Sequence, residues 1–208
     1  MGEKEYAASN LEKNIENLPD DGVALLKNIY LWSSKNDRYY EFIKKNIPIQ
    51  KLSDVDLPIL AKIGAEKGDI EIAIGCYEEL ISRTKNDKYL LDAAELMEYA
   101  GKPELSIKYY ERHYAKTKAV ESIERLSELS YALGDREGGR KYQRQKVFDE
   151  KNTTAVREFI TKEAADGFEA EALKDAALYK DMTGGVESVE FFAEIAATGN
   201  DIKAAKNA

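Results

Sequence analysis

Five glycines recur at a nearly constant interval, and no other feature of the sequence limits the possible fold as strongly. They stand at Gly68, Gly101, Gly134, Gly167 and Gly199, with spacings of 33, 33, 33 and 32 residues. A period in this range is typical of arrays in which one helical unit repeats and stacks on its neighbours. Because glycine adopts left-handed turn conformations without steric strain, each of these residues is expected to end a helix and let the chain reverse.

The segments between these glycines have the composition of helices. Ala, Glu, Lys and Leu fill them, none of the four prolines interrupts a long periodic run, and no stretch shows the sustained alternation of a strand. The sequence therefore predicts an all-α fold built from helix–turn–helix units.

A small residue follows each glycine at a distance of five positions. These residues are Ala73, Ser106, Gly139, Ala172 and Ala204. Seven positions before the glycine, the first three units also have small residues, namely Ala61, Ala94 and Ser127. Two antiparallel helices approach closely only where the side chains between them are short. We therefore expect both registers to lie buried between the two helices of each hairpin.

The unit resembles the tetratricopeptide repeat, whose pattern has a turn glycine followed by an acid, an alanine five residues later and a small residue seven residues earlier. The segment LPILAKIGAEKGDIEIAIGCYEELI, from Leu57 to Ile81, matches this pattern well. The resemblance covers residues 55–208 as about four and a half repeats. It implies an α-α superhelix, that is, a right-handed solenoid of helical hairpins. Residues 1–54 are expected to be diverged N-terminal helices of the same single domain, with a hairpin that turns at residues 34–37.

The chain departs from the family pattern in two ways. Ile160 and Phe192 replace small residues in the fourth and fifth units, and Lys85, Lys118 and Lys151 stand where the family usually has proline. A lysine in the last turn interacts favourably with the helix dipole, so these helices are expected to end without the proline ring. The last helix of the final unit, which ends at Ala208, is expected to fray.

Composition excludes several classes of function. The formal net charge is -8, which opposes binding to nucleic acid and to anionic lipid. No apolar run approaches the length needed to span a bilayer, and the first residues lack the apolar stretch of a secretory signal. The single cysteine, Cys76, cannot form an intramolecular disulfide. A cytoplasmic protein without a membrane segment is expected.

Candidates for catalysis are few, so we expect a protein that is not an enzyme and needs no cofactor or metal. The only histidine, His113, falls on the apolar seam of a second helix, where packing is the simpler interpretation. Cys76 has no basic neighbour to lower the pKa of its thiol. The glycine-rich segments TGGVES and GDREGGR lack the lysine spacing or the preceding strand of a phosphate-binding loop.

The first helix of each unit has a second face, opposite its apolar stripe. Positions thirteen, nine, six and two before the glycine lie on this face because they advance by four, three and four residues. The face comprises Val55, Ile59, Lys62, Glu66, Lys88, Asp92, Glu95, Tyr99, Glu121, Arg125, Glu128, Ala132, Thr154, Glu158, Thr161, Ala165, Val186, Glu190, Ala193 and Ala197. It carries seven acids and three bases. In the tetratricopeptide family, this face lines a concave groove that receives a partner peptide.

The resemblance therefore implies a protein–protein interaction scaffold whose mostly acidic groove receives a peptide or helix of a partner. A basic or mixed partner segment is expected, because Asp92 and Glu121 stand where the family's carboxylate-binding version needs an asparagine and a base. The candidate groove residues are Ile59, Lys62, Asp92, Glu95, Tyr99, Glu121, Arg125, Glu128, Tyr131 and Glu158. An equal alternative is a groove that is solvated or filled by the protein's own terminal helix.

A basic stripe provides an alternative from another class of function. Arg136, Arg140 and Arg144 recur every four residues in the segment from Arg136 to Lys146. A regulatory or nucleic-acid-associated domain could use this stripe, although a solvated face paired with nearby acids is the simpler interpretation. A noncatalytic subunit of an enzyme complex is a third alternative. The identity of the partner and the oligomeric state stay open.

Overall fold

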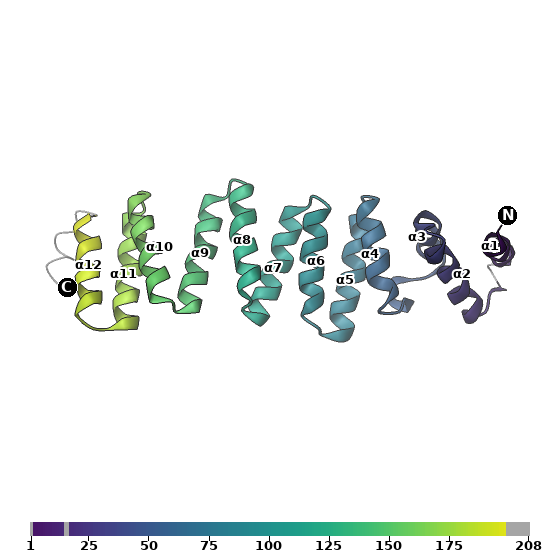
Figure 1. The fold of residues 1–208 in the computed structure, drawn as a ribbon, viewed down its shortest axis with the longest axis horizontal. Helices are drawn as coiled ribbons and strands as arrows, with labels where there is room; N and C mark the ends of the chain where they lie inside the picture. Colours follow the sequence, from purple (N-terminus) through teal and green to yellow (C-terminus); the bar gives the residue numbers. More distant parts are fainter. Residues whose placement is uncertain (1, 15–16, 199–208) are drawn as a thin grey trace. The chain divides into compact units, whose positions relative to one another are not determined.

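The computed structural model of the protein describes residues 2–14 and 17–198, and these residues contain helices and no strand (Figure 1). The all-α prediction is confirmed. In chain order the helices are α1 (Glu3–Lys13), α2 (Asp20–Trp32), α3 (Asn36–Asn46), the short 3₁₀ helix η2 (Ile49–Lys51), α4 (Asp56–Glu66), α5 (Ile70–Thr84), α6 (Lys88–Tyr99), α7 (Pro103–Thr117), α8 (Val120–Ala132), α9 (Arg136–Glu150), α10 (Thr153–Ala165), α11 (Glu169–Thr183) and α12 (Val186–Thr198).

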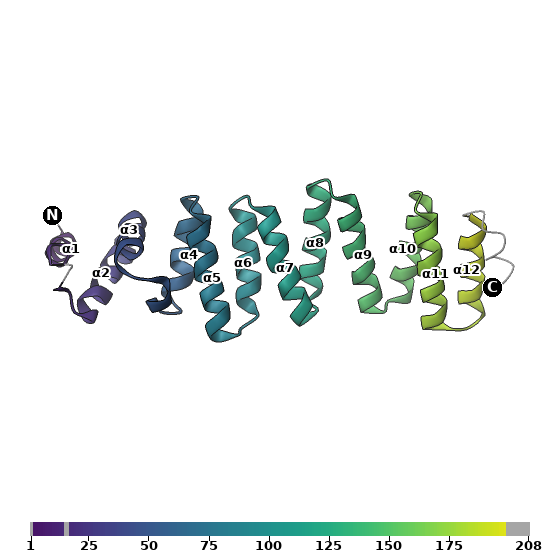
Figure 2. The ribbon, with the colours of Figure 1, turned by 180° about the vertical axis from the view of Figure 1, so that it is seen from behind.

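The chain forms two compact units, Met1–Thr117 and Lys118–Ala208. In the first unit, α4 packs against α5 and α6 against α7, while α5 contacts α6 and α3 contacts α4. In the second unit, the hairpins are α8 with α9 and α10 with α11, and α12 packs on α11 (Figures 1 and 2). Each predicted helical hairpin of the described ranges is thus present. The expected fraying of the final helix, and Gly199 and Ala204, lie outside the described residues.

The turn inside each hairpin has the same backbone geometry. Gly68, Gly101, Gly134 and Gly167 have φ values of 78°, 67°, 83° and 89°. The amide of the residue after each glycine donates to the carbonyl five residues before it, as Asp69 does to Gly64 at 2.8 Å. This bond is the signature of a helix that ends on a left-handed residue. Ser34 takes the same place in the α2–α3 hairpin with a φ of 53°. The predicted turn is therefore present, but α3 begins at Asn36, so residues 36 and 37 of the predicted turn are helical.

A second left-handed residue closes each second helix, seventeen positions after the turn glycine. Lys85, Lys118 and Lys151 have φ values of 52°, 56° and 53°, and Gly184 takes this place in the following repeat with a φ of 65°. The helices end at these lysines without proline, as expected. The ending comes from a left-handed backbone, a conformation that costs an L-residue roughly 1–2 kcal/mol relative to glycine, rather than from a lysine within the last helical turn.

The short residues of the hairpin registers are buried, which confirms the close helix approach. Ala61 and Ala73 have no exposed surface, and the same is true of Ala94 and Ser106. In the α8–α9 hairpin, the Ser127 hydroxyl donates to the carbonyl oxygen of Gly139 at 3.0 Å. Backbone and side chain touch directly at this register because Ser127 has a short side chain and Gly139 has none.

The fourth and fifth units, which have Ile160 and Phe192 in place of small residues, pack these larger side chains against small ones. Ile160 is fully buried in a core that it shares with Val156, Ala172, Ala176 and Phe191. Phe192 packs against the same core from its edge. Larger side chains on the first helices are therefore accommodated by alanines on α11, since a core keeps its total volume when a large residue faces a small one.

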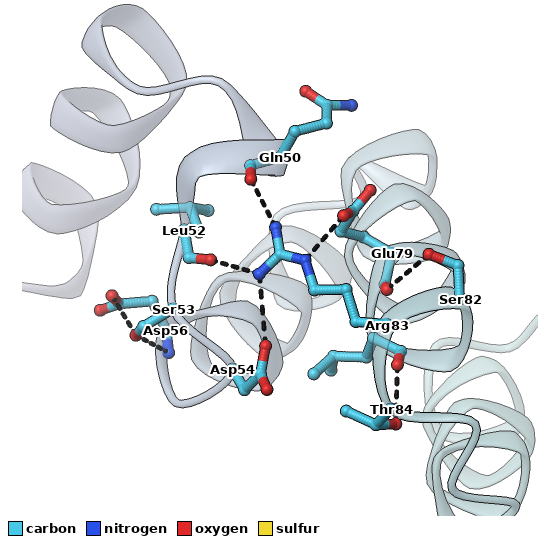
Figure 3. A network of polar contacts seen from close by, with 10 residues as sticks. Gln50, Leu52, Ser53, Asp54, Asp56, Glu79, Ser82, Arg83 and Thr84 are labelled. Carbon is cyan, nitrogen blue, oxygen red and sulfur yellow. Dashed lines mark hydrogen bonds and ion pairs between the residues drawn. The ribbon is translucent and has the colours of Figure 1, made fainter.

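The linker between the α2–α3 hairpin and α4 is fixed by Arg83 of α5 (Figure 3). The Arg83 guanidinium donates to the carbonyl oxygen of Leu52 at 2.6 Å and to that of Gln50 at 2.5 Å. It also reaches the carboxylates of Asp54 and Glu79, at 3.2 and 2.7 Å. One planar side chain thus satisfies two carbonyls of an irregular segment that has few partners of its own.

Asp56 joins three helices at the start of α4. Its carboxylate accepts hydrogen bonds from Lys27 of α2 at 2.5 Å, from Tyr39 of α3 at 3.0 Å and from Ser53 at 2.6 Å. Burial acts to raise the pKa of Asp56, but these bonds outweigh it and hold the pKa below its usual value of 3.8. The carboxylate therefore stabilises the packing of the leading hairpin in its ionised form.

Candidate functional site

The predicted faces of the first helices are open to solvent in both units. None of the twenty face residues is buried. In the first unit, Lys62 of α4 and Glu95 of α6 are exposed, while Ile59 and Asp92 are half-buried. Tyr99, at the end of α6, exposes 74% of its surface. An aromatic side chain this exposed contributes little to folding and is available for contact.

Two carboxylates of α6 lie close to a tyrosine of the preceding hairpin. Tyr77 of α5 is buried, and burial, together with Asp92 and Glu95, raises the pKa of its phenol to about 12. The phenol therefore stays neutral at any physiological pH, so the charges beside it are the two carboxylates. Asp92 and Glu95 thus lie beside a neutral aromatic side chain in this part of the first unit.

On α8, in the second unit, two of the candidate residues pair with each other. The Arg125 guanidinium binds the Glu128 carboxylate three residues later. Glu121 is exposed on the same helix. The pair lies on the surface, where water and salt screen it, so it contributes little to stability.

Tyr131 has a partly structural role that sequence reasoning missed. Its ring lies so close to Gly139 of α9 that a methyl group added there would come within 2.7 Å of two ring carbons. Its hydroxyl donates to Gln143 at 3.2 Å. The side chain still exposes 41% of its surface, above a hollow of about 600 Å³ shared with Arg136 and Phe168.

A deeper hollow of about 960 Å³ lies between α10 and α12, and we call it the first-helix groove. All four predicted face residues of α10, Thr154, Glu158, Thr161 and Ala165, line it. Its floor contains Tyr179 of α11 with Phe191 and Ile195 of α12, which are buried in the hydrophobic core. The volume lies within the range typical of sites that hold a ligand or a few residues of a peptide.

On its α12 side, the first-helix groove is lined by residues one position after the predicted face residues. Glu187, Phe191 and Glu194 line it instead of the predicted Val186, Glu190 and Ala193. The two helices present different sides to each other, so a single set of offsets cannot describe both walls. The α10 wall is formed by the predicted face positions, and the α12 wall is formed by the positions one residue after them.

Two cations also lie in this groove. The Arg157 guanidinium sits over the Phe191 ring, 4.6 Å from its centroid, and so connects α10 with α12. Lys162 is exposed on the α10 wall. Together with Glu158 on α10 and with Glu187 and Glu194 on α12, the groove has three acids and two bases. Its charge is mixed with a slight acidic excess.

The basic stripe of α9 is occupied by ion pairs within the chain. Arg144 binds both carboxylate oxygens of Asp175, at distances of 2.6 to 2.9 Å. Arg140 binds Glu163 at 2.6 Å, and Lys146 binds Glu124 at 2.5 Å. The simpler interpretation, a face paired with nearby acids, describes these residues well, and their charges are largely compensated.

The two residues considered for catalysis are packed in the protein interior. His113 is 7% exposed on α7, in agreement with a packing role. Cys76 has no exposed surface on α5, and burial raises the pKa of its thiol to about 12. A thiol in this state is protonated and shielded, which makes it a poor nucleophile.

Residues 2–14 and 17–198 bring no three His, Cys, Asp or Glu side chains together in the geometry of a metal site. In the same ranges, no helix has both the length and the apolar character needed to cross a membrane.

Comparison with known proteins gives similarity at the level of structure. The chain is similar to a tetratricopeptide repeat protein from Parabacteroides merdae, at 13% identity and a TM-score of 0.46 over 97% of this chain and 81% of that one. It is similar to Pseudomonas aeruginosa pilF, at 14% identity and a TM-score of 0.38 over 99% and 90% of the two chains. YrrB, described as a tetratricopeptide repeat protein with an unusual peptide-binding site, is 16% identical with a TM-score of 0.37 over 79% and 85%.

No family model and no curated protein sequence matches the chain. The assignment to helical hairpins is carried by its own repeated turns and buried small residues.

Proposed function

We propose that the protein is a noncatalytic interaction module whose first-helix faces bind a segment of a partner protein. The observation that carries this proposal is the first-helix groove between α10 and α12. It combines a preformed hollow, an apolar floor of Tyr179, Phe191 and Ile195, and charged walls. An apolar anchor residue of the partner can bury its surface on the floor, while the walls select its flanking charges.

The partner segment is basic or mixed in charge. Three carboxylates against two cations in the groove favour lysine or arginine beside the anchor, with an acid able to reach Arg157 or Lys162. In the first unit, Asp92 and Glu95 add a second acidic face, with Ile59 and Tyr99 as apolar contacts. Nucleic acid is disfavoured as a partner because Arg140 and Arg144 already bind carboxylates.

Selection from a random peptide library displayed on phage tests this function with the full chain. Enriched peptides are expected to place an apolar residue next to lysine or arginine. Their affinity is expected to fall at least about tenfold when Glu158 and Glu194 are both changed to lysine, which corresponds to about 1.4 kcal/mol. Asp181→Lys, an exposed change on α11 of the same unit, is the matched control and should leave binding unchanged.

Tyr99→Ala tests the face of the first unit separately. Because this side chain is 74% exposed, its removal should not affect folding. Loss of binding by some selected peptides would assign those peptides to the first unit. The proposal is wrong if the library yields no enriched sequence, or if the enriched peptides bind the Glu158→Lys, Glu194→Lys and Tyr99→Ala variants as well as the natural protein.

A further inference from the structure

The α2–α3 hairpin extends the first-helix faces of the first unit, although no glycine marks its turn. The Lys35 amide donates to the Tyr30 carbonyl at 2.8 Å, which is the bond that Asp69 makes to Gly64. Ser34 is therefore the counterpart of the turn glycines. The positions thirteen, nine, six and two residues before Ser34 lie on one side of α2 and are all exposed, and they are Asp21, Leu25, Asn28 and Trp32.

Asp56 holds this hairpin against α4. Its carboxylate accepts from Lys27 at 2.5 Å and from Tyr39 at 3.0 Å. Lys27 lies seven positions before Ser34 and Tyr39 five positions after it, the registers at which the other hairpins have their buried small residues. Because α4 also contacts α6, the faces of α2, α4 and α6 are neighbours within one compact unit.

One row of residues crosses these three faces at the same end of each helix. Trp32, Glu66 and Tyr99 each lie two positions before the left-handed residue of their hairpin turn. We call these three residues the aromatic row. Trp32 exposes 65% of its surface and Tyr99 74%, and Glu66, on the helix between them, is also exposed. Within the described part of the chain, no hydrogen bond or ion pair engages the Glu66 carboxylate.

The aromatic row is a feature of the first unit. In the second unit, Ala132 and Ala165 stand two positions before Gly134 and Gly167. The turn therefore forms without an aromatic residue at this position. Exposed tryptophan and tyrosine rings that the fold does not require are typical of contact surfaces.

The chemistry of the row favours a basic and apolar partner. Exposed aromatic rings pack against apolar side chains and attract cations to their faces. The carboxylate of Glu66 attracts a lysine or arginine and repels an acid. Packed helices lie about 8–10 Å apart, and an extended chain advances about 3.3 Å per residue. An extended segment that crosses the three helices therefore meets the next one roughly every three residues.

A helical segment fits the row less well. A helix with its side chains is about 10–12 Å wide, so it would also cover the positions one turn earlier, where Lys62 is exposed on α4. A basic residue of such a helix would be repelled by Lys62 while it approached Glu66.

We infer that the aromatic row binds an extended segment of a partner protein, in which a lysine or arginine pairs with Glu66 and apolar residues three positions away on each side pack on Trp32 and Tyr99. This inference rests on the proposed function and names the partner sequence for the first unit. If peptides selected from the library depend only on Glu158 and Glu194, the proposed function stands and this inference fails.

Titration of the full chain with a synthetic peptide, followed by the fluorescence of Trp32, tests the inference. The probe is a nine-residue peptide with leucine at its second and eighth positions, lysine at its fifth, and glycine or serine elsewhere. Trp32 is the only tryptophan, so its emission should move to shorter wavelengths in a saturable way, with a dissociation constant of about 1 mM or tighter. Two control peptides should bind at least about fivefold more weakly, one with glutamate in place of lysine and one with the lysine moved next to a leucine.

A charge exchange at Glu66 separates recognition from folding. Because Glu66 is exposed, Glu66→Lys should leave the melting temperature unchanged, weaken binding of the lysine peptide and strengthen binding of the glutamate peptide. Glu71→Lys, an exposed change on α5 outside the row, alters the net charge equally and should affect neither titration. Tyr99→Ala should weaken binding of the lysine peptide at least about threefold, with Trp32 still present as the reporter.

Three results would overturn the inference. The first is that the lysine peptide gives no saturable change in the emission of Trp32. The second is that either control peptide binds as tightly as the lysine peptide. The third is that Glu66→Lys or Tyr99→Ala leaves the affinity for the lysine peptide as it is in the natural protein.

Discussion

Gly139 of α9 is in contact with the ring of Tyr131 on α8. We therefore expect Gly139→Ala to destabilise the natural protein but to stabilise a Tyr131→Ala variant. Gly139 is buried near the start of α9, as its fourth residue, and glycine within a helix costs up to about 1 kcal/mol relative to alanine in helix propensity. A methyl group at this position would lie 2.7 Å from Cδ2 and Cε2 of Tyr131 and 2.8 Å from Cγ. These atoms include the base of the ring, which cannot move without shifting the whole side chain.

The two effects oppose each other, and their sizes predict the result. Overpacking of this kind costs about 1–3 kcal/mol, so Gly139→Ala should destabilise the natural protein by up to about 2 kcal/mol after the propensity gain. In a Tyr131→Ala background the obstacle is absent, and the same change should stabilise by about 1 kcal/mol. The coupling between the two positions is then about 1–3 kcal/mol.

Native-state hydrogen exchange of α8 and α9 measures these differences within the second unit, alongside urea denaturation followed by circular dichroism. Exchange is the better readout because the two units need not unfold together. Ala170→Gly, an exposed change in α11, should cost about 1 kcal/mol in both backgrounds and provides the control. The reasoning is refuted if Gly139→Ala stabilises the protein equally with and without the Tyr131 ring.

Three further predictions concern the turns and the first unit. Lys85→Gly should raise the free energy of unfolding in urea by about 0.5–1 kcal/mol, because glycine adopts the left-handed conformation without strain. The control Lys108→Gly, within α7, should lower it by about 1 kcal/mol. Equal effects of the two changes would contradict the prediction. Arg83→Lys should cost about 1–3 kcal/mol and speed hydrogen exchange near Leu52, because the compact lysine ammonium cannot span the two carbonyls and two carboxylates that the planar guanidinium contacts. Arg38→Lys, at an exposed ion pair, should change little. Since the pKa of Asp56 is lowered on folding, its contribution is present above pH 3.8 and is lost as the pH falls below this value. Urea midpoints followed by the fluorescence of Trp32 should therefore drop less steeply with acid in Asp56→Asn than in the natural protein, and parallel curves would show that the carboxylate is not linked to folding.

The hairpins could be predicted from the sequence because their determinants are local. A glycine with a left-handed φ, such as Gly101, and a short residue five positions later, such as Ser106, define a turn and a contact within one repeat. Neither depends on how successive hairpins are placed. The same reasoning found the turn at Ser34, where no glycine marks it.

The candidate site could be predicted only in part because its walls belong to different hairpins. Thr154, Glu158 and Thr161 were found from helical periodicity, but the choice of Glu194 over Ala193 depends on the rotation of α12 against α10. Helices were predicted in residues 1–54, but the bounds of α1 could not be predicted because α1 has no counterpart in the repeated pattern.

Buried charge was also beyond the sequence analysis. Glu163 occupies the position after Lys162 in a polar stretch, and nothing local indicates that it is 4% exposed. Its burial depends on Arg140, which is 23 residues away along the chain. Long-range pairs of this kind carry no periodic signal.

The left-handed lysines determine which insertions and deletions the chain can accept without disturbing a turn. Lys118 and Lys151 leave their helices with φ values of 56° and 53°, so the chain enters α8 and α10 from the same backbone state. If a copy of residues 119–151 were inserted after Lys151, the inserted segment would begin after one left-handed lysine and end on another. Both junctions would then have the same backbone conformation as the natural ones. Additions or deletions of one whole hairpin are therefore the length changes that such a gene can tolerate, whereas smaller ones would disrupt a turn.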